Sequence, residues 1–348
     1  EIDAGKWFNA SVDACLLVIE FGEVRNGLAI PVFPDLDSNL PSRRIGVANG
    51  DLVADVDAYR RAEFADEPCP IAWRQGLKHD VVGVMELRSG EGYLMNGNQQ
   101  IVDVESEYLF PLAKSTDLFH GRVDGTRQVI VPQSHLGQAL DHLSNDAPRL
   151  WGYLPSHRKR FDARKSSIYR SSGPFSFFGI GPYSFAPYKV CISGLHKETR
   201  FRVIGPIGKK PVMLDDTSYF LPFPSPEAAA LAAAILNTHI KELLVRALVF
   251  WDAKRPVTKR ILARLGLLAI LNHADRAQIV AKAESIMSEF APGHSPQWPL
   301  HLESLLVDAY RPAAQPNAAS SRHSAALQTR LLENNAPYDD LAPLTYSP

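Results

Sequence analysis

The sequence Phe178-Gly-Ile-Gly-Pro-Tyr-Ser-Phe-Ala-Pro-Tyr-Lys-Val-Cys-Ile-Ser-Gly-Leu195 belongs to the stretch from Arg149 to Lys210, around which we expect the rest of the chain to be organised. Its first half, as far as Phe185, is a glycine-punctuated aromatic loop, and its second half is an apolar run of strand length that carries Lys189. A Gly-x-Gly pair is a weak phosphate-loop signal by itself. The dinucleotide-binding fingerprint needs a third glycine at the start of a helix, and none follows here.

The whole stretch, residues 149–210, is the most basic part of the chain and holds thirteen Lys or Arg side chains against two acids, Asp162 and Glu198. Residues 1–148 hold twelve basic and twenty-three acidic side chains, and residues 211–348 hold twelve and thirteen, so the net charge of −1 hides a strong asymmetry. Clustered cations favour a polyanionic partner, because they neutralise phosphates and release counterions. The interleaved aromatic residues either stack on bases or fill a core. A solvated basic face over a sheet is the alternative.

The composition is that of an ordinary globular chain: 348 residues, 45% apolar and 22% charged, with room for one large or two medium domains. No run approaches the roughly 18 apolar residues of a membrane span. The start shows no signal peptide, which predicts a cytoplasmic protein. The three cysteines, Cys15, Cys69 and Cys191, are widely spaced and predict reduced thiols. Because the chain opens without methionine, we expect it to be a piece of something longer.

The N-terminal part opens with an apolar run, Val12 to Phe21, that predicts a strand covered on both faces, with Leu28 to Phe33 pairing as a hairpin. Leu52, Val56 and Tyr59 predict a short helix. Short strands are then expected at residues 81–87, 92–95, 100–104 and 128–131, with Asn96-Gly97 as a hairpin turn and a helix through Leu136, Leu140 and Leu143.

The C-terminal part begins with two expected strands, 211–214 and 219–223. Ser225-Pro226 predicts the start of a helix that continues to Leu248. Further helices are expected after Thr258 and over residues 274–290. Beyond Pro292 the composition shifts to Pro, Ala, Ser and Asn, which predicts a disordered tail.

Two segments supply candidate DNA-binding side chains. The loop Trp73-Arg-Gln-Gly-Leu-Lys-His-Asp80 is crowded with groups that read base edges, although such loops are more often simply polar. Its candidate base readers are Trp73, Arg74, Gln75, Lys78 and His79. In the basic stretch, cations and hydroxyls that bond phosphate oxygens stand side by side. The candidates there are Arg158, Lys159, Arg160, Arg164, Lys165, Ser166, Tyr169, Arg170, Tyr183 and Lys189.

Four motifs carry a resemblance to a known family. They are Arg164-Lys-Ser-Ser-Ile-Tyr169, Phe178 to Val190, Asp215-Asp-Thr-Ser-Tyr-Phe220 and Ala234-Ile-Leu-Asn-Thr238. As a set they resemble the C-terminal half of adenine-specific DNA methyltransferases of the TaqI-like and type IIG restriction-modification group. In that family such motifs belong to the target recognition domain. The opening residues 2–16 look like the closing strands of the family's methyltransferase domain, and the resemblance covers roughly residues 1–268.

The chain departs from the family where the chemistry lies. The family binds S-adenosylmethionine on a glycine-bearing loop and holds a flipped adenine with an Asn-Pro-Pro-Tyr-like motif. Neither motif is found here, since Gly179-Ile-Gly181 has the wrong context and Asn145-Asp-Ala-Pro148 lacks the aromatic residue. Methyl transfer needs both pockets. We therefore expect no catalytic residue and no cofactor in this chain, which alone should be inactive, with S-adenosylmethionine implied for the complete enzyme.

The resemblance implies an α+β fold: a mixed or antiparallel recognition sheet followed by helices, with a remnant of a Rossmann-like methyltransferase sheet at the N-terminus. The expected boundaries are 1–40 for the remnant, 41–224 for the DNA target recognition domain, 225–292 for a helical segment and 293–348 for the tail. The implied partners are double-stranded DNA and an N-terminal methyltransferase half, with no membrane.

A different class of function is a stand-alone metal-dependent nuclease or an RNA-acting protein. Asp80 with Glu86-Leu-Arg88 is the nearest nuclease-like set, but Arg cannot serve as a neutral base. Asp215-Asp216 would hold Mg²⁺ only with help, and adjacent acids before a strand are usually turn formers. The histidines show no metal-ligand spacing. The sequence therefore predicts no metal site.

Overall fold

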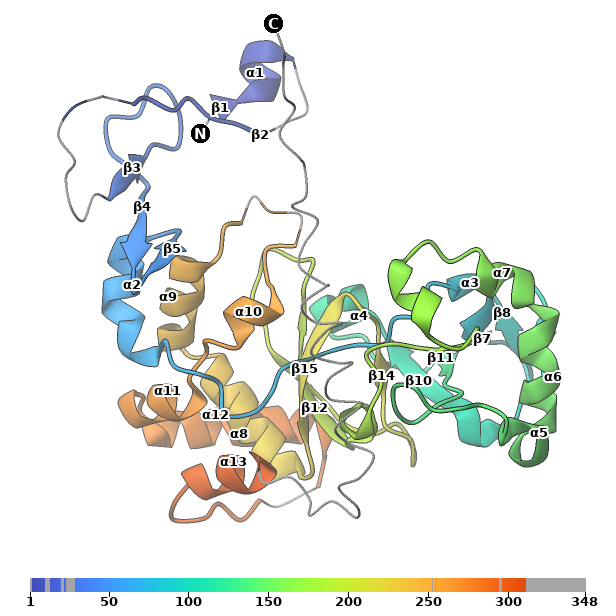
Figure 1. Cartoon of the computed structure of the whole chain (residues 1–348). Helices are drawn as coiled ribbons and strands as arrows, with labels where there is room; N and C mark the ends of the chain where they lie inside the picture. Colours follow the sequence, from blue (N-terminus) through green and yellow to red (C-terminus); the bar gives the residue numbers. More distant parts are fainter. Residues whose placement is uncertain are drawn as a thin grey trace, which may run out of the picture.

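The protein is a mixed α/β chain in which two lobes meet along a central segment (Figure 1). The computed structural model describes residues 2–9, 13–19, 22, 29–251, 253, 255–293 and 296–310. The predicted tail from residue 311 onward lies outside the described residues.

The first lobe is built on a four-stranded antiparallel sheet in the order β13-β12-β15-β6. Its strands are β13 (Arg202–Ile204), β12 (Tyr188–Ser193), β15 (Ser218–Phe223) and β6 (Arg74–Gln75). Strand β12 confirms the prediction for residues 188–195. Val190 and Ile192 point into the core with the helices, whereas Cys191 and Phe220 join a second cluster on the opposite face. Because side chains alternate along a strand, the sheet is buried on both faces.

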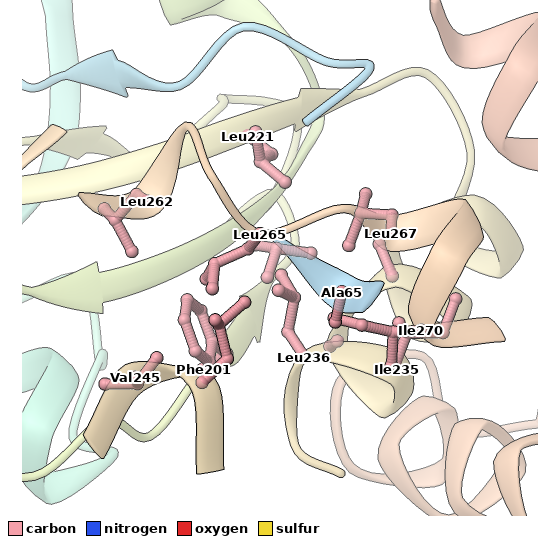
Figure 2. Close-up of a cluster of buried hydrophobic side chains, with 14 of the residues drawn as sticks. Ala65, Phe201, Leu221, Ile235, Leu236, Val245, Leu262, Leu265, Leu267 and Ile270 are labelled. Atoms are coloured by element: carbon pink, nitrogen blue, oxygen red, sulfur yellow. The ribbon is translucent and has the colours of Figure 1, made fainter. Parts of the chain in front are cut away.

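Helices cover one face of this sheet. Helix α8 (Pro226–Leu236) packs on β12 and β15, and α12 (Arg276–Phe290) packs on α8. Ser225 caps α8 as predicted, since its hydroxyl accepts from the amide of Ala228. Figure 2 shows the core that results, where leucine and isoleucine side chains from α8, β15 and the later helices converge around Phe201.

The predicted single helix from Ser225 to Leu248 is wrong, because the chain forms two helices bent by 62°. The break falls at Asn237, whose side-chain amide donates to the carbonyl of Phe201 at 2.8 Å and whose oxygen accepts from the amide of Phe201 at 3.1 Å. Thr238 then caps the second helix, α9 (His239–Leu248), through the amide of Lys241. A tertiary contact therefore ends a helix that its apolar pattern would have continued.

The remaining elements of this lobe surround that core. Helix α13 lies within the segment predicted as a tail and packs on α8, so that prediction is wrong for these residues. These elements are α2 (Val56–Ala62), which packs on α9, the 3₁₀ helix η1 (Glu63–Ala65), α10 (Lys259–Leu262), α11 (Leu267–His273) and α13 (Glu303–Tyr310).

The second lobe contains a six-stranded sheet in the order β14-β10-β11-β7-β8-β9, in which only the β10–β14 pair is parallel among the described strands. Asn96-Gly97 lies in the turn between β8 and β9, as predicted. The strand predicted over 81–87 is divided between α3 and β7, and β10 was not predicted. The strands are β7 (Glu86–Ser89), β8 (Leu94–Asn96), β9 (Ile101–Val102), β10 (Leu109–Ala113), β11 (Arg127–Ile130) and β14 (Met213–Leu214).

Short helices complete this lobe. The helix predicted through Leu136 and Leu140 is instead a series of turns before α5, and Pro148 begins a further helix, α6. The helices are α3 (Val82–Met85), α4 (Ser115–His120), α5 (Leu143–Asp146), α6 (Pro148–Ser156), α7 (Arg158–Asp162) and the 3₁₀ turns η2 (Ser106–Tyr108), η3 (Ser167–Ser171) and η4 (Pro182–Phe185).

The N-terminal strands differ most from expectation. The strand predicted from Val12 to Phe21 is reduced to β2 (Asp13–Ala14), which pairs with β1 (Ile2–Asp3); Val12, Glu20 and Phe21 lie outside the described residues. Leu16, Leu17, Val18 and Ile19 are 62–75% exposed. The segment predicted to pair with this run forms β3 (Ile30–Val32), which pairs with β4 (Arg43–Ala48) instead. The other elements are α1 (Ala4–Phe8) and β5 (Asp51–Val53).

No single helix in the described ranges is long and apolar enough to cross a bilayer. Helices α8 and α9 meet the length and composition of a span only as a bent pair.

Candidate nucleic-acid interface

The residues Trp73–Asp80, which we call the crossing segment, connect the two lobes. Figure 1 shows this segment passing in front of β15 towards the second lobe. After β6, the amide of Leu77 donates to the carbonyl of Leu214 at 2.7 Å, and Lys78 exchanges two backbone hydrogen bonds of 2.9 Å with Phe178. The crossing segment is therefore hydrogen-bonded to elements of both lobes.

Two glycines allow this close approach. A Cβ on Gly76 would lie 2.1 Å from the carbonyl oxygen of Asp215. Gly179 has a φ of +69°, and a Cβ there would lie 2.3 Å from the carbonyl oxygen of Gly76. Only glycine fits at such contacts. The glycine-rich loop thus serves as packing for the crossing segment.

Two predicted base readers of the crossing segment are buried. Trp73 is 1% exposed and packs against Phe201, with ring centroids 5.8 Å apart. His79 is stacked on Phe177, and its Nδ1 accepts from the amide of Val81 at 3.2 Å. Burial, together with the charge of Lys114, lowers the pKa of His79 to about 4, so the ring is neutral at pH 7. Neither side chain is placed to touch a base.

The other three predicted readers, Arg74, Gln75 and Lys78, are half-buried. The guanidinium of Arg74 lies 4.4 Å from the ring centroid of Tyr183, another predicted residue. Gln75 donates from Nε2 to the carbonyl of Asp216 at 2.5 Å. Lys78 Nζ lies 2.9 Å from Asp80 and 3.5 Å from Asp216. Arg74 therefore lies against Tyr183, whereas Gln75 and Lys78 lie beside Asp216.

Sequence reasoning did not identify Lys259, a cation close to Arg74. Lys259 begins α10, and its pKa is lowered by burial and by the nearby charge of Arg74. In the sequence Lys259 is separated from Arg74 by 185 positions and belongs to a helix start, so no local signal indicated its place. A helical residue thus joins the residues predicted to read DNA.

The second candidate region, Arg158–Arg170, is called the basic segment. Arg158, Lys159 and Arg160 are exposed on α7, and Lys165 and Arg170 are exposed in the loop and turn that follow, where Ser166 is half-buried. Arg158 pairs with Asp162 at 2.8 Å. Within the described part of the chain, the other four exposed cations have no acidic partner within 4 Å. These side chains remain available to a polyanion.

Arg164 and Tyr169 do a different task within the basic segment. Arg164 donates to the carbonyls of Phe161 at 3.0 Å, Ser176 at 2.8 Å and Pro174 at 2.6 Å, and its guanidinium lies 3.6 Å from the ring centroid of Tyr169. Burial lowers the pKa of Arg164, and burial with the charge of Asp80 raises that of Tyr169. Arg164 and Tyr169 therefore hold the chain around residues 161–176 in place. The structure does not support a phosphate contact by Arg164.

Lys189 is also withdrawn from solvent. The side chain is 2% exposed, and Nζ donates to the carbonyl of Ala186 at 2.7 Å. Burial lowers its pKa to about 8. Because β12 is a central strand with Lys189 facing the second cluster, its ammonium cannot reach a phosphate in this structure.

The carboxylates considered for a nuclease are held by the protein itself. Glu86 pairs with Lys114 Nζ at 2.6 Å, and burial raises its pKa. Asp215 accepts from the hydroxyls of Thr217 at 2.8 Å and Ser218 at 2.7 Å. Among the described residues, no three His, Cys, Asp or Glu side chains are grouped as metal ligands. These acids act as ion-pair and turn partners.

The loop that contains Gly179 and Gly181 does not fit S-adenosylmethionine. A Cβ on Gly181 would lie 2.5 Å from the ring of Tyr183, and the space beside Gly179 is taken by Gly76. The space beside both glycines is therefore occupied by other residues of the same chain, which leaves no room for a ligand there. Asn145 lies in α5 and Pro148 begins α6, so that sequence likewise forms part of two helices.

Comparison with known proteins shows that this chain is related to a type II DNA methyltransferase. The relative is type II methyltransferase M.NspV of Nostoc sp. (strain ATCC 29411 / PCC 7524), 39% identical over 269 residues, which are 77% of this chain. The matched part is 56% of the relative, so this chain spans about half its length. No family model matches. A solved structure of the type IIL restriction-modification enzyme MmeI with DNA aligns at a TM-score of 0.41 and 11% identity, covering 83% of this chain and 41% of that one.

Proposed function

We propose that this chain is the DNA-recognition part of a type II restriction-modification methyltransferase that modifies adenine at N6. The observation that carries the proposal is the 39% identity to M.NspV over 77% of the chain. The resemblance of the motifs around Arg164, Phe178 and Asp215 to target recognition domains supports the finer assignment. In the complete enzyme, S-adenosylmethionine supplies the methyl group.

Within this proposal the two candidate regions have different tasks. The exposed cations of the basic segment contact phosphates, which fixes the position of the protein on DNA without reading sequence. Arg74, Gln75 and Lys78, with Tyr183 and Lys259 near Arg74, contact base edges. Arg and Gln are suited to that role because each forms two hydrogen bonds with one base.

The catalytic pockets belong to a partner half in this proposal. Residues 1–40 are the closing part of the methyltransferase domain, residues 41–224 the recognition domain and residues 225–292 its helical support. The exposed apolar run Leu16 to Ile19 supports this division, because a long bare apolar segment is normally covered. The partner is an N-terminal methyltransferase half that is continuous in the gene or a separate subunit.

DNA binding is tested by fluorescence anisotropy with double-stranded oligonucleotides over a range of salt. If about six phosphates are contacted, affinity should fall roughly a thousandfold between 50 and 200 mM salt. Replacing Arg158, Lys159 and Arg160 by Ala should reduce the slope of log affinity against log salt by about 3. The control is Lys6→Ala with Arg88→Ala, two exposed cations elsewhere. Equal slopes for the wild type and the triple variant would contradict the phosphate role.

The partner is tested by co-expression with the part of M.NspV that lies outside the match. We expect a soluble complex that methylates adenine N6 when S-adenosylmethionine is added. Leu17→Asp with Val18→Asp should prevent assembly, whereas Leu300→Asp, which changes a residue that is 90% exposed, should not. A chain that lacks residues 1–22 yet still assembles and methylates would show that the partner docks elsewhere.

A further inference from the structure

A groove of about 910 Å³ lies where the loop after β12, strand β13 and helices α9 and α12 meet. Six cations line it against three acids, Glu198, Glu242 and Glu289. The cations are Lys197, Arg200, Arg202, Lys241, Arg246 and Lys282. Three of them come from the end of the basic stretch 149–210 and three from helices α9 and α12. The fold therefore brings together cations that lie far apart in the sequence.

The floor of the groove holds a buried ammonium. Lys241 is 4% exposed, and Nζ donates to the carbonyl of Thr199 at 3.0 Å and to its hydroxyl at 3.3 Å. A lysine has three donors, so one remains. Burial lowers the pKa of Lys241 to about 8, with the charge of Glu242 opposing this shift and that of Lys282 adding to it. An anion bound in the groove would offset both the burial of this ammonium and its repulsion by Lys282.

The rim of the groove carries four exposed cations and three exposed acids, and one of the cations, Arg200, pairs with Glu198 at 2.5 Å. Lys197, Arg246 and Lys282 are exposed. Lys282 donates to the carbonyl of Asn237 at 2.8 Å, and a neutral acceptor leaves its charge in place. Arg246 lies 3.4 Å from Asp55. The rim therefore offers at least two cations whose charge is not cancelled by a carboxylate in the described structure.

The positive lining continues beyond the groove. Arg246 also borders a second hollow of about 360 Å³, which contains Arg43, Arg44 and Arg61 with Asp55 and Asp57. Arg44 pairs with Asp57 at 2.6 Å and Arg246 lies 3.4 Å from Asp55, so the lining keeps a formal excess of two positive charges between α9 and β4. A run of cations over two adjoining hollows suits an extended polyanion better than a small anion, because successive phosphates bind successive cations.

We propose that this groove binds the sugar-phosphate backbone of double-stranded DNA that flanks the recognised sequence. The inference rests on the proposed function and adds a second contact surface to it. The apolar side chains of Ile286 and Phe290 in the lining face the sugars, and the rim cations face the phosphates. The helical segment then takes part in DNA binding as well as supporting the sheet.

The test uses the full chain with Lys197, Arg246 and Lys282 replaced by Ala, and duplexes of two lengths that share one central sequence. With the longer duplex, the salt slope should fall by about 3, one for each lost phosphate contact. With a short duplex that contains only the recognised sequence and no flanking base pairs, the salt slope should stay at the wild-type value. The triple variant at Arg158, Lys159 and Arg160 should lower the slope with both duplexes, and the Lys6 and Arg88 control with neither.

A gain of charge gives a second, independent readout. Glu289 is exposed and lines the groove, so Glu289→Lys should raise the slope by about one with the longer duplex only. Thermal unfolding of each variant separates loss of fold from loss of contact.

The outcomes separate the two proposals. If the wild-type chain does not bind DNA, the proposed function fails. If the basic-segment variant loses affinity while the groove variants behave as wild type, the proposed function stands and the groove proposal is overturned. The groove proposal is also overturned if inorganic phosphate or ATP stabilises the wild type but not the groove triple variant, while DNA slopes are unchanged.

Discussion

The crossing segment and the basic segment look alike in sequence and differ in the structure. Both are polar, both contain cations and aromatic residues, and both were predicted to touch DNA. In the crossing segment, Trp73 and His79 are buried and the remaining readers bond to their own chain. In the basic segment, Lys159 and Arg160 are exposed.

The difference follows from where the two segments lie. The crossing segment is hydrogen-bonded to elements of both lobes, so its side chains fill the space between them. Helix α7 lies on the outside of its lobe, and only Phe161 among its five residues is buried. A buried polar group needs a bonding partner, whereas an exposed one is satisfied by water. The comparison therefore distinguishes cations that hold the fold together from cations that are free for a ligand.

The largest expected contrast is in stability. Trp73→Ala should lower the free energy of unfolding by about 4 kcal/mol, because it leaves a cavity in the core of the first lobe. Lys159→Ala, at an exposed position, should change it by less than about 0.5 kcal/mol. Urea unfolding of both variants measures the difference. Similar losses for the two would remove the distinction between the segments.

A second contrast concerns pH. The pKa of His79 is about 4 in the folded protein, whereas an unfolded histidine titrates near 6.5. Between these values the unfolded state binds more protons, so stability falls as the pH drops from 6.5 towards 4, by roughly 3 kcal/mol from this group. His79→Gln should remove that part of the pH dependence, measured by urea unfolding at pH 7 and pH 4.5.

The neighbours of His79 are shared by both proteins in that comparison. Lys114, Asp80, Arg164, Lys78 and Glu86 lie near the ring, and all five are present in both the wild type and the variant. The difference between the wild type and the variant therefore isolates the imidazole. If the two curves run parallel below pH 6.5, the ring is not buried as a neutral group.

The smallest expected contrast is between two neighbouring residues of the basic segment, Arg164 and Lys165. Arg164→Ala should lower the free energy of unfolding by about 2 kcal/mol, since it removes charge-assisted hydrogen bonds to three carbonyls. Lys165→Ala should leave stability within about 0.5 kcal/mol and reduce the salt slope of DNA binding by about one. Thermal unfolding and anisotropy on both variants are the measurements. The assignment of Arg164 fails if its loss weakens only DNA binding.

Local signals predicted the elements that depend on neighbours in sequence. Strand β12, the hairpin at Asn96-Gly97 and the cap at Ser225 were all expected, because apolar runs, turn residues and capping hydroxyls act over a few positions. Strand β10 was not predicted, and one of its two partners, β14, comes from a distant part of the chain. The end of α8 was also missed, because Asn237 binds Phe201.

By itself, the sequence determined that the chain is a mixed α/β protein with a strongly basic middle, and its motifs alone indicated a relation to DNA methyltransferases. Tertiary structure alone decided which cations face water. Lys189 and Lys159 are the same residue type in the same basic stretch, yet one is 2% exposed in a central strand and the other lies on an outer helix. Exposure depends on what packs over a residue, and that is set by segments far away in the chain.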